Sequence, residues 1–145
     1  MTRRGIAWTL GIIAVLASVI PAFAGVDEPI AIHHLDHSGL VLLGAAAAFF
    51  VRDPSAKGSP ASGARWLVLT VLAPIAMMFV MWPSLYDYLD AHASLHALEH
   101  LVLAALGYVA VAAGERYVRG VGATMGVLMF VMAVLSAAGY GVMKP

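Results

Sequence analysis

Residues 33–44 read HHLDHSGLVLLG, and residues 96–107 read HALEHLVLAALG. Each stretch begins a long apolar run with two histidines four residues apart and an acidic residue directly before the second histidine. In a helix, side chains at positions i and i+4 project from the same face. The two stretches therefore predict two helices that each present a pair of imidazoles near the start. All six histidines of the chain lie in these stretches or just before the second one.

The composition indicates a membrane protein. Of 145 residues, 62% are hydrophobic and 11% are charged, and the mean hydropathy is +0.91. This leaves too little polar surface to cover a soluble globule. The formal net charge is zero and no basic tract is present, which argues against nucleic acid as a partner. Cysteine is absent, so imidazole, carboxylate and thioether groups are the available metal ligands.

Five apolar runs are each near the ~20 residues that a helix needs to cross a bilayer. They cover residues 5–24, 29–51, 66–82, 92–113 and 120–141. The sequence thus predicts an all-α integral membrane protein with five transmembrane helices and the lipid bilayer as its surroundings.

The first run has two interpretations. Residues 1–24 combine a basic start, an apolar stretch and a small-residue end, which is also the pattern of a cleavable signal peptide. We therefore expect either an N-terminal transmembrane helix or a signal peptide there. Residues 25–145 are expected to form a four-helix membrane bundle in both cases.

The basic residues predict the orientation in the membrane. They cluster on alternate connections between the apolar runs, and the positive-inside rule assigns those connections to the cytoplasm. We expect a multi-pass protein of the cytoplasmic (plasma) membrane, with the N-terminus inside and both histidine clusters on the outer side. The residues that decide this are Arg3, Arg4, Arg52, Lys57, Arg65, Arg116 and Arg119.

The chain also contains an apparent internal repeat. A constant offset of 63 positions aligns His33 with His96, His37 with His100 and Gly44 with Gly107. A shorter match at an offset of 51 aligns residues 78–81 with 129–132, both MFVM. We predict two helical hairpin repeats, residues 29–82 and 92–141, which bring the two histidine faces to equal depth across the bundle. The sequence leaves open whether the two clusters form one site.

Two such faces predict a metal site. Imidazoles from both clusters would bind the ion, and the adjacent carboxylates would bind it or orient the imidazole rings. A site rich in imidazole and without thiolate suits copper or zinc, with iron possible if both carboxylates bind. The candidate metal residues are His33, His37, His96, His100, Asp36 and Glu99, followed by His34 and His92.

Methionines near the outer end of the third run give copper a further argument. Met77, Met78 and Met81 are predicted close to the histidine layer, where thioethers are able to hold Cu(I). Core packing is the simpler interpretation of these methionines.

Haem and oxygen chemistry are the alternatives. His37 with His100 would supply two axial ligands to a b-type haem in an electron-transfer subunit. That arrangement leaves the other histidines without a role. A histidine-box membrane oxygenase is a third possibility, but such boxes face the cytoplasm and are more numerous. No nucleophile motif is present, and we assign no catalytic residues. Near the helix ends the histidines could also be merely solvated.

The stretches that begin at His33 and His96 resemble the His-x-x-x-His-leucine motifs of CtaG-type cytochrome c oxidase assembly factors, and of related small archaeal membrane proteins. The resemblance implies a polytopic protein that takes part in maturing the copper centre of a terminal oxidase. It marks His33, His37, His96 and His100 as the metal residues. The larger members have more membrane spans than five, so the chain is expected to be a reduced relative or an accessory subunit of a respiratory or oxygenase complex.

Overall fold

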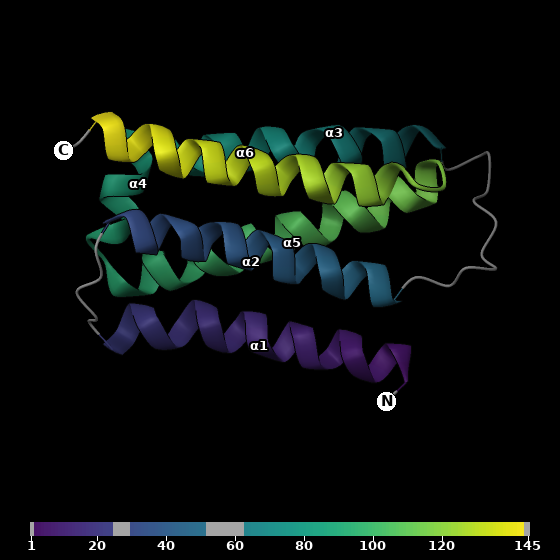
Figure 1. Cartoon of the computed structure of the whole chain (residues 1–145), viewed down its shortest axis with the longest axis horizontal. Helices are drawn as coiled ribbons and strands as arrows, with labels where there is room; N and C mark the ends of the chain where they lie inside the picture. The colour runs from purple at the N-terminus through teal and green to yellow at the C-terminus, as the bar shows by residue number, and fades with distance from the viewer. Residues whose placement is uncertain (1, 25–29, 52–62, 144–145) are drawn as a thin grey trace.

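The computed structural model describes residues 2–24, 30–51 and 63–143, and this part of the chain is helical without a β-strand. Five long helices run side by side along the long axis, and one short helix lies at an end of the molecule (Figure 1). The helices are α1 (Arg3–Ala24), α2 (Ile30–Val51), α3 (Gly63–Val80), α4 (Pro83–Asp90), α5 (Ala93–Tyr117) and α6 (Val121–Met143).

Helix α5 is the centre of the bundle. It contacts all the other helices, and its most extensive pairing is with α2. These two helices begin at the same end of the molecule and run in the same direction (Figure 1). Helices α1 and α6 each pack against both α2 and α5, whereas α3 packs mainly on α5. Any group at the start of α2 is thus brought beside the start of α5.

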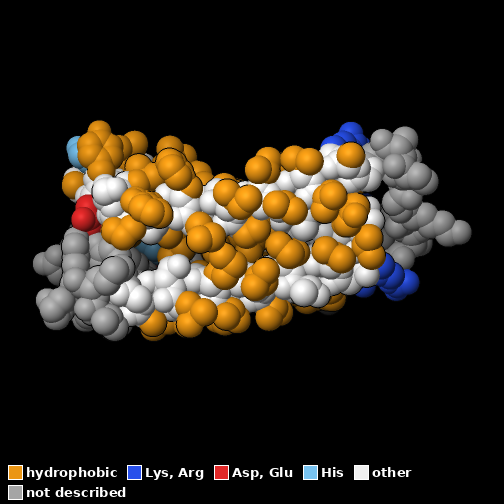
Figure 2. Space-filling view, turned by 90° about the horizontal axis from the view of Figure 1, so that it is seen from above, with side chains coloured by type: hydrophobic (Ala, Val, Ile, Leu, Met, Phe, Trp, Pro, Cys, Tyr) orange, Lys and Arg blue, Asp and Glu red, His pale blue; other side chains and the backbone are white. Residues whose placement is uncertain are grey.

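The surface of the bundle fits a membrane. Four of the described helical segments are long and apolar enough to cross a bilayer. Large apolar side chains cover the flank of the molecule, and charged side chains gather at its two ends (Figure 2). A flank of this kind contacts lipid, because water would not support so large an apolar surface. The four segments are Arg3–Pro21, Gly63–Val80, Ala93–Tyr117 and Val121–Gly139.

In α2, the stretch Leu35–Val51 is an apolar helical segment as well. The prediction of an all-α membrane protein is therefore confirmed, while a fifth span through α2 remains a prediction.

The helix α4 was not predicted. Trp82 has an extended backbone, and Pro83 occupies the first turn of a new helix, where its missing N–H costs nothing. The expected run of residues 66–82 is thus a helix that ends at Val80, followed by a turn and the separate helix α4. This turn places Tyr86 and Asp90 beside the start of α5.

Two glycines let α2 and α5 approach closely. A Cβ atom added to Gly44 would overlap the carbonyl oxygen of Ala104, and one added to Gly107 would overlap the carbonyl oxygen of Val41. Val41 and Ala104 are themselves 63 positions apart, so the two contacts are reciprocal. The contact between the helices therefore repeats at the same offset as the histidine motifs.

The second helices of the two expected hairpins lack this reciprocity. Met78 of α3 is exposed on the flank, whereas its aligned partner Met129 of α6 is fully buried. Helix α6 packs on both α2 and α5, while α3 packs mainly on α5. The duplication thus remains a prediction, and the packing that accords with it is that between α2 and α5.

Helix α1 packs into the bundle. Its Ala14 lies in an apolar cluster with Leu40 of α2 and Ala104 of α5, and its Ser18 is fully buried. The small side chains at these positions allow α1 to lie close to both neighbours. The structure thus describes residues 3–24 as a packed helix, and cleavage as a signal peptide remains an untested alternative.

Candidate metal centre

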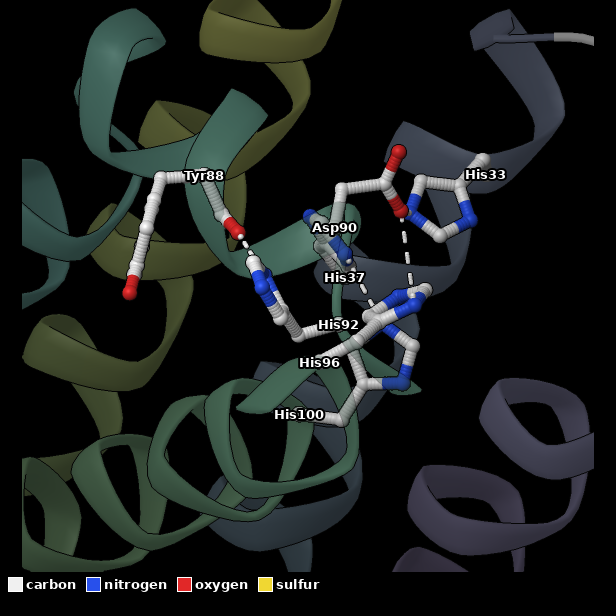
Figure 3. Close-up of polar contacts among 7 residues, drawn as sticks. All are labelled: His33, His37, Tyr88, Asp90, His92, His96 and His100. Atoms are coloured by element: carbon white, nitrogen blue, oxygen red, sulfur yellow. Dashed lines mark hydrogen bonds and ion pairs between the residues drawn. The ribbon is translucent and has the colours of Figure 1, made fainter. Parts of the chain in front are cut away.

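Four histidines converge at one end of the bundle. His33 and His37 of α2 and His96 and His100 of α5 each offer one nitrogen atom, and these four atoms lie within 4.8 Å of one another. Figure 3 shows their rings turned toward each other from the two helices. The two sequence clusters therefore meet and form a group that can hold a metal ion. We call these residues the four-histidine group.

The pairing of the rings follows the register of the two helices. The ring centroids of His33 and His96 are 4.8 Å apart, and so are those of His37 and His100. Spacing of four residues puts both rings of a pair on one face of their helix. The close contact at Gly44, about two turns further along α2, keeps these faces against each other. Each histidine of α2 thus faces its counterpart on α5.

The group has an inner and an outer layer. His37 and His100 are 0% and 2% exposed, and they form the inner pair. The side chains of His33 and His96 are 17% and 11% exposed, and they form the outer pair. Tyr86 of α4 is buried beside the group, with its ring centroid 5.6 Å from that of His37. The site is therefore closed on the bundle side and reaches solvent on the outer side.

The contacts among the rings favour a cation. The Nε2 atom of His100 lies 2.9 Å from the Nε2 atom of His37 and 2.9 Å from that of His96. A neutral imidazole nitrogen carries either one proton or one lone pair. His100 Nε2 therefore makes only one well-aligned hydrogen bond to its two neighbours. A metal ion instead accepts a lone pair from every ring.

The distances also match a single ion. Metal–nitrogen bonds of ~2.0–2.1 Å in a tetrahedral site place the nitrogen atoms about 3.3 Å from one another. The observed contacts of 2.9 Å and the outer limit of 4.8 Å bracket this value. Small rotations of the rings thus suffice to form a four-nitrogen site.

A carboxylate also contacts the group, from a residue that the histidine spacing did not predict. Asp90, the last residue of α4, places Oδ1 3.4 Å from Nδ1 of His96 and 3.9 Å from Nε2 of His33 (Figure 3). The carboxylate oxygen lies on the Nδ1 side of the His96 ring, whose Nε2 atom faces His100.

The two acidic residues of the sequence motifs lie outside the four-histidine group. Asp36 is exposed. Glu99 is buried, and within the described part of the chain neither of its carboxyl oxygens has a hydrogen-bond partner. Each acid directly precedes a histidine, and adjacent side chains on a helix point ~100° apart. The same spacing that aligns the histidines therefore turns the acids away from the four-histidine group, and a role in metal binding remains a prediction.

The two remaining histidines are not part of the group either. His92 is exposed before the start of α5, and its Nδ1 donates a hydrogen bond to the carbonyl oxygen of Tyr88 at 3.0 Å. The side chain of His34 lies outside the described residues. Met77 is buried in an apolar cluster with Leu103 and Met129, which accords with core packing.

The chain has no match among known proteins in three comparisons: no family model, no curated protein and no solved structure is similar to it. The resemblance to the oxidase assembly factors therefore remains an expectation from the two histidine motifs.

Proposed function

We propose that this protein holds one copper ion among His33, His37, His96 and His100 at the outer end of a membrane bundle. It would serve the assembly of a respiratory or oxygenase metalloenzyme, or act as an accessory subunit of one. The observation that carries the proposal is the approach of four imidazole nitrogens to within 4.8 Å of one another. A terminal oxidase is the partner that the motif resemblance implies.

The geometry favours an ion over the haem alternative. Two axial nitrogens on opposite faces of a haem are about 4 Å apart, with the macrocycle between them. The facing nitrogens of His37 and His100 are 2.9 Å apart, and His33 and His96 also crowd this space. Further along, Gly44 and Gly107 hold the two backbones in contact. A haem would have to separate the helices, whereas an ion fits between the rings.

Copper is the metal that the ligand set supports best. Among divalent first-row ions, copper binds nitrogen ligands most tightly, and a set of four imidazoles without thiolate is one that copper accepts. Zinc is the second choice. Iron is less suited, because Asp36 and Glu99 lie outside the group. The same point weakens the histidine-box oxygenase alternative, which requires ligands for two irons.

The charges at the two ends support the proposed orientation in the plasma membrane. Arg65 and Arg116 both place their guanidinium groups over the ring of Trp66, at 4.6 and 4.8 Å. Basic side chains lie at that end, and acidic and histidine side chains lie at the opposite end (Figure 2). With the basic end in the cytoplasm, five spans place the N-terminus inside and the four-histidine group outside.

Elemental analysis and an optical spectrum of the detergent-purified protein test the proposed function. We expect about one copper per chain and no Soret band. A Soret band would instead identify a b-type cytochrome. Protein that contains neither metal nor haem, and that takes up neither copper nor zinc when these are added, would contradict a metal-binding function.

Cysteine labelling tests the orientation, because the natural chain has no cysteine. We propose two variants, Ser84→Cys in α4 and Arg119→Cys between α5 and α6, since both positions are exposed at opposite ends of the bundle. A membrane-impermeant maleimide should label the first variant in intact spheroplasts and the second only after permeabilisation. The opposite pattern would reverse the orientation.

A further inference from the structure

We propose that Asp90 is the transfer ligand through which a metal ion enters and leaves the four-histidine group. This inference rests on the proposed metal site and adds the route by which the site is loaded. It is drawn from the position of one carboxylate that contacts both outer histidines and is itself exposed to solvent.

Exposure decreases in steps from Asp90 to the inner pair. The Asp90 side chain is 48% exposed, whereas those of His33 and His96 are 17% and 11% exposed. His37 and His100 are closed off from solvent. An ion that arrives from water therefore meets the Asp90 carboxylate before it meets any of the four imidazoles.

The contacts of Asp90 join the two helices of the site. Its Oδ1 atom lies 3.9 Å from Nε2 of His33 on α2 and 3.4 Å from Nδ1 of His96 on α5. These are the outer histidines, and each is in ring contact with an inner one: His33 with His37 at 4.8 Å, and His96 with His100 at 4.2 Å. A continuous series of ligands thus leads from the surface to the buried pair.

Charge gives the carboxylate a second advantage. The four-histidine group itself consists of imidazoles, which must be neutral to bind a metal. Asp90 forms ion pairs with both outer histidines, His33 and His96. A negative charge at the opening of a site raises the local concentration of cations and the rate at which they associate.

The transfer is a series of ligand exchanges without redox chemistry. The hydrated cation first exchanges a water molecule for Asp90 Oδ1. The Nε2 lone pair of His96, whose Nδ1 faces Asp90, and a nitrogen lone pair of His33 would then displace further waters. Those of His37 and His100 would displace the carboxylate and the last water. Departure follows the same steps in reverse. Asp90 therefore accelerates both directions and leaves the binding equilibrium nearly unchanged.

The test compares the wild type with Asp90→Asn, which keeps the shape of the side chain and removes its charge. Uptake is measured with Cu²⁺ by stopped flow, release with excess EDTA, and affinity by competitive titration. We expect both rates to fall about tenfold or more in the variant, with little change in affinity. Asp90→Glu, which retains a carboxylate, should largely restore both rates.

Asp87→Asn is the matched control, because Asp87 is another exposed acid of α4 and its replacement removes the same charge. The uptake and release rates of Asp87→Asn should stay near those of the wild type. If they fell as much as those of Asp90→Asn, the effect would be one of overall charge, and the inference would be overturned. Unchanged rates in Asp90→Asn would also overturn it. A third result would overturn the inference: Asp90→Asn releases copper faster, takes it up at the wild-type rate and binds it ~10–100-fold more weakly. That result is expected for a carboxylate that only orients His96.

Uptake of Cu²⁺ by the wild-type protein tests the proposed function separately. If wild-type protein takes up no Cu²⁺, both the metal site and its transfer ligand are refuted. If wild-type protein binds Cu²⁺ and Asp90→Asn behaves like it, the site stands and the transfer role of Asp90 alone is refuted.

Discussion

Replacing His37 and His100 together with alanine should abolish stoichiometric metal binding. Structural sites with four ligands are worth about 10–16 kcal/mol, or roughly 3 kcal/mol for each ligand. Loss of two ligands therefore costs about 6 kcal/mol, which corresponds to an affinity roughly 10⁴-fold weaker. His33 and His96 would remain as a two-nitrogen site near the surface. Competitive copper titration of the purified variant measures the loss.

His92→Ala is the matched control for this double variant. His92 is exposed and lies outside the four-histidine group, although it is only four residues from His96. The His92→Ala variant should bind copper with the same affinity as the wild type. Because alanine leaves space in the buried layer, the same double replacement with glutamine provides a second variant that fills more of that space. Wild-type affinity in both double variants would contradict the site.

Replacing Gly44 and Gly107 with alanine should destabilise the bundle and weaken metal binding together. The new Cβ atoms would overlap the carbonyl oxygens of Ala104 and Val41, which belong to the backbone and have no alternative rotamer. Overpacking costs about 1–3 kcal/mol at each site. Relief requires α2 and α5 to separate, and this separation also draws apart the rings of His37 and His100. Thermal unfolding in detergent and copper titration measure the two effects.

Gly39→Ala is the control in the same helix. A Cβ atom at Gly39 meets nothing within 4 Å, so the replacement should leave metal binding unchanged. It should also raise stability by up to about 1 kcal/mol, because alanine favours the helix more than glycine does. If the Gly44→Ala, Gly107→Ala double variant unfolds at the wild-type temperature and binds copper normally, the close contact of α2 with α5 is not what positions the site.

Two signals in the sequence pointed to the four-histidine group. Spacing of four residues placed His33 with His37, and His96 with His100, on single helix faces. The offset of 63 then predicted equal depth for the two faces in the bundle, without deciding whether they form one site. Periodicity alone does not decide whether two helices turn the same faces toward each other. The reciprocal contacts of Gly44 and Gly107 provide the physical reason why they do.

The position of Asp90 was not predictable from hydropathy. Residues 83–90 form a short helix after a turn at Pro83, and only this turn brings Asp90 back to the start of α5. Sequence spacing likewise suggested Asp36 and Glu99 as ligands, because each lies next to a histidine. In a helix, sequence neighbours point ~100° apart, so the acid that contacts the imidazoles comes from another element.

Hydropathy predicted five membrane spans, and four of the described helical segments are long and apolar enough to cross a bilayer. A fifth span through α2, whose described apolar segment is Leu35–Val51, remains a prediction.

X-ray absorption spectroscopy of copper-loaded wild-type protein tests the central claim most directly. A single ion held by His33, His37, His96 and His100 predicts about four nitrogen neighbours near 2.0 Å, with the outer-shell scattering of imidazole rings. Sulfur neighbours, two or fewer imidazoles, or a second metal at short distance would contradict the four-histidine copper site.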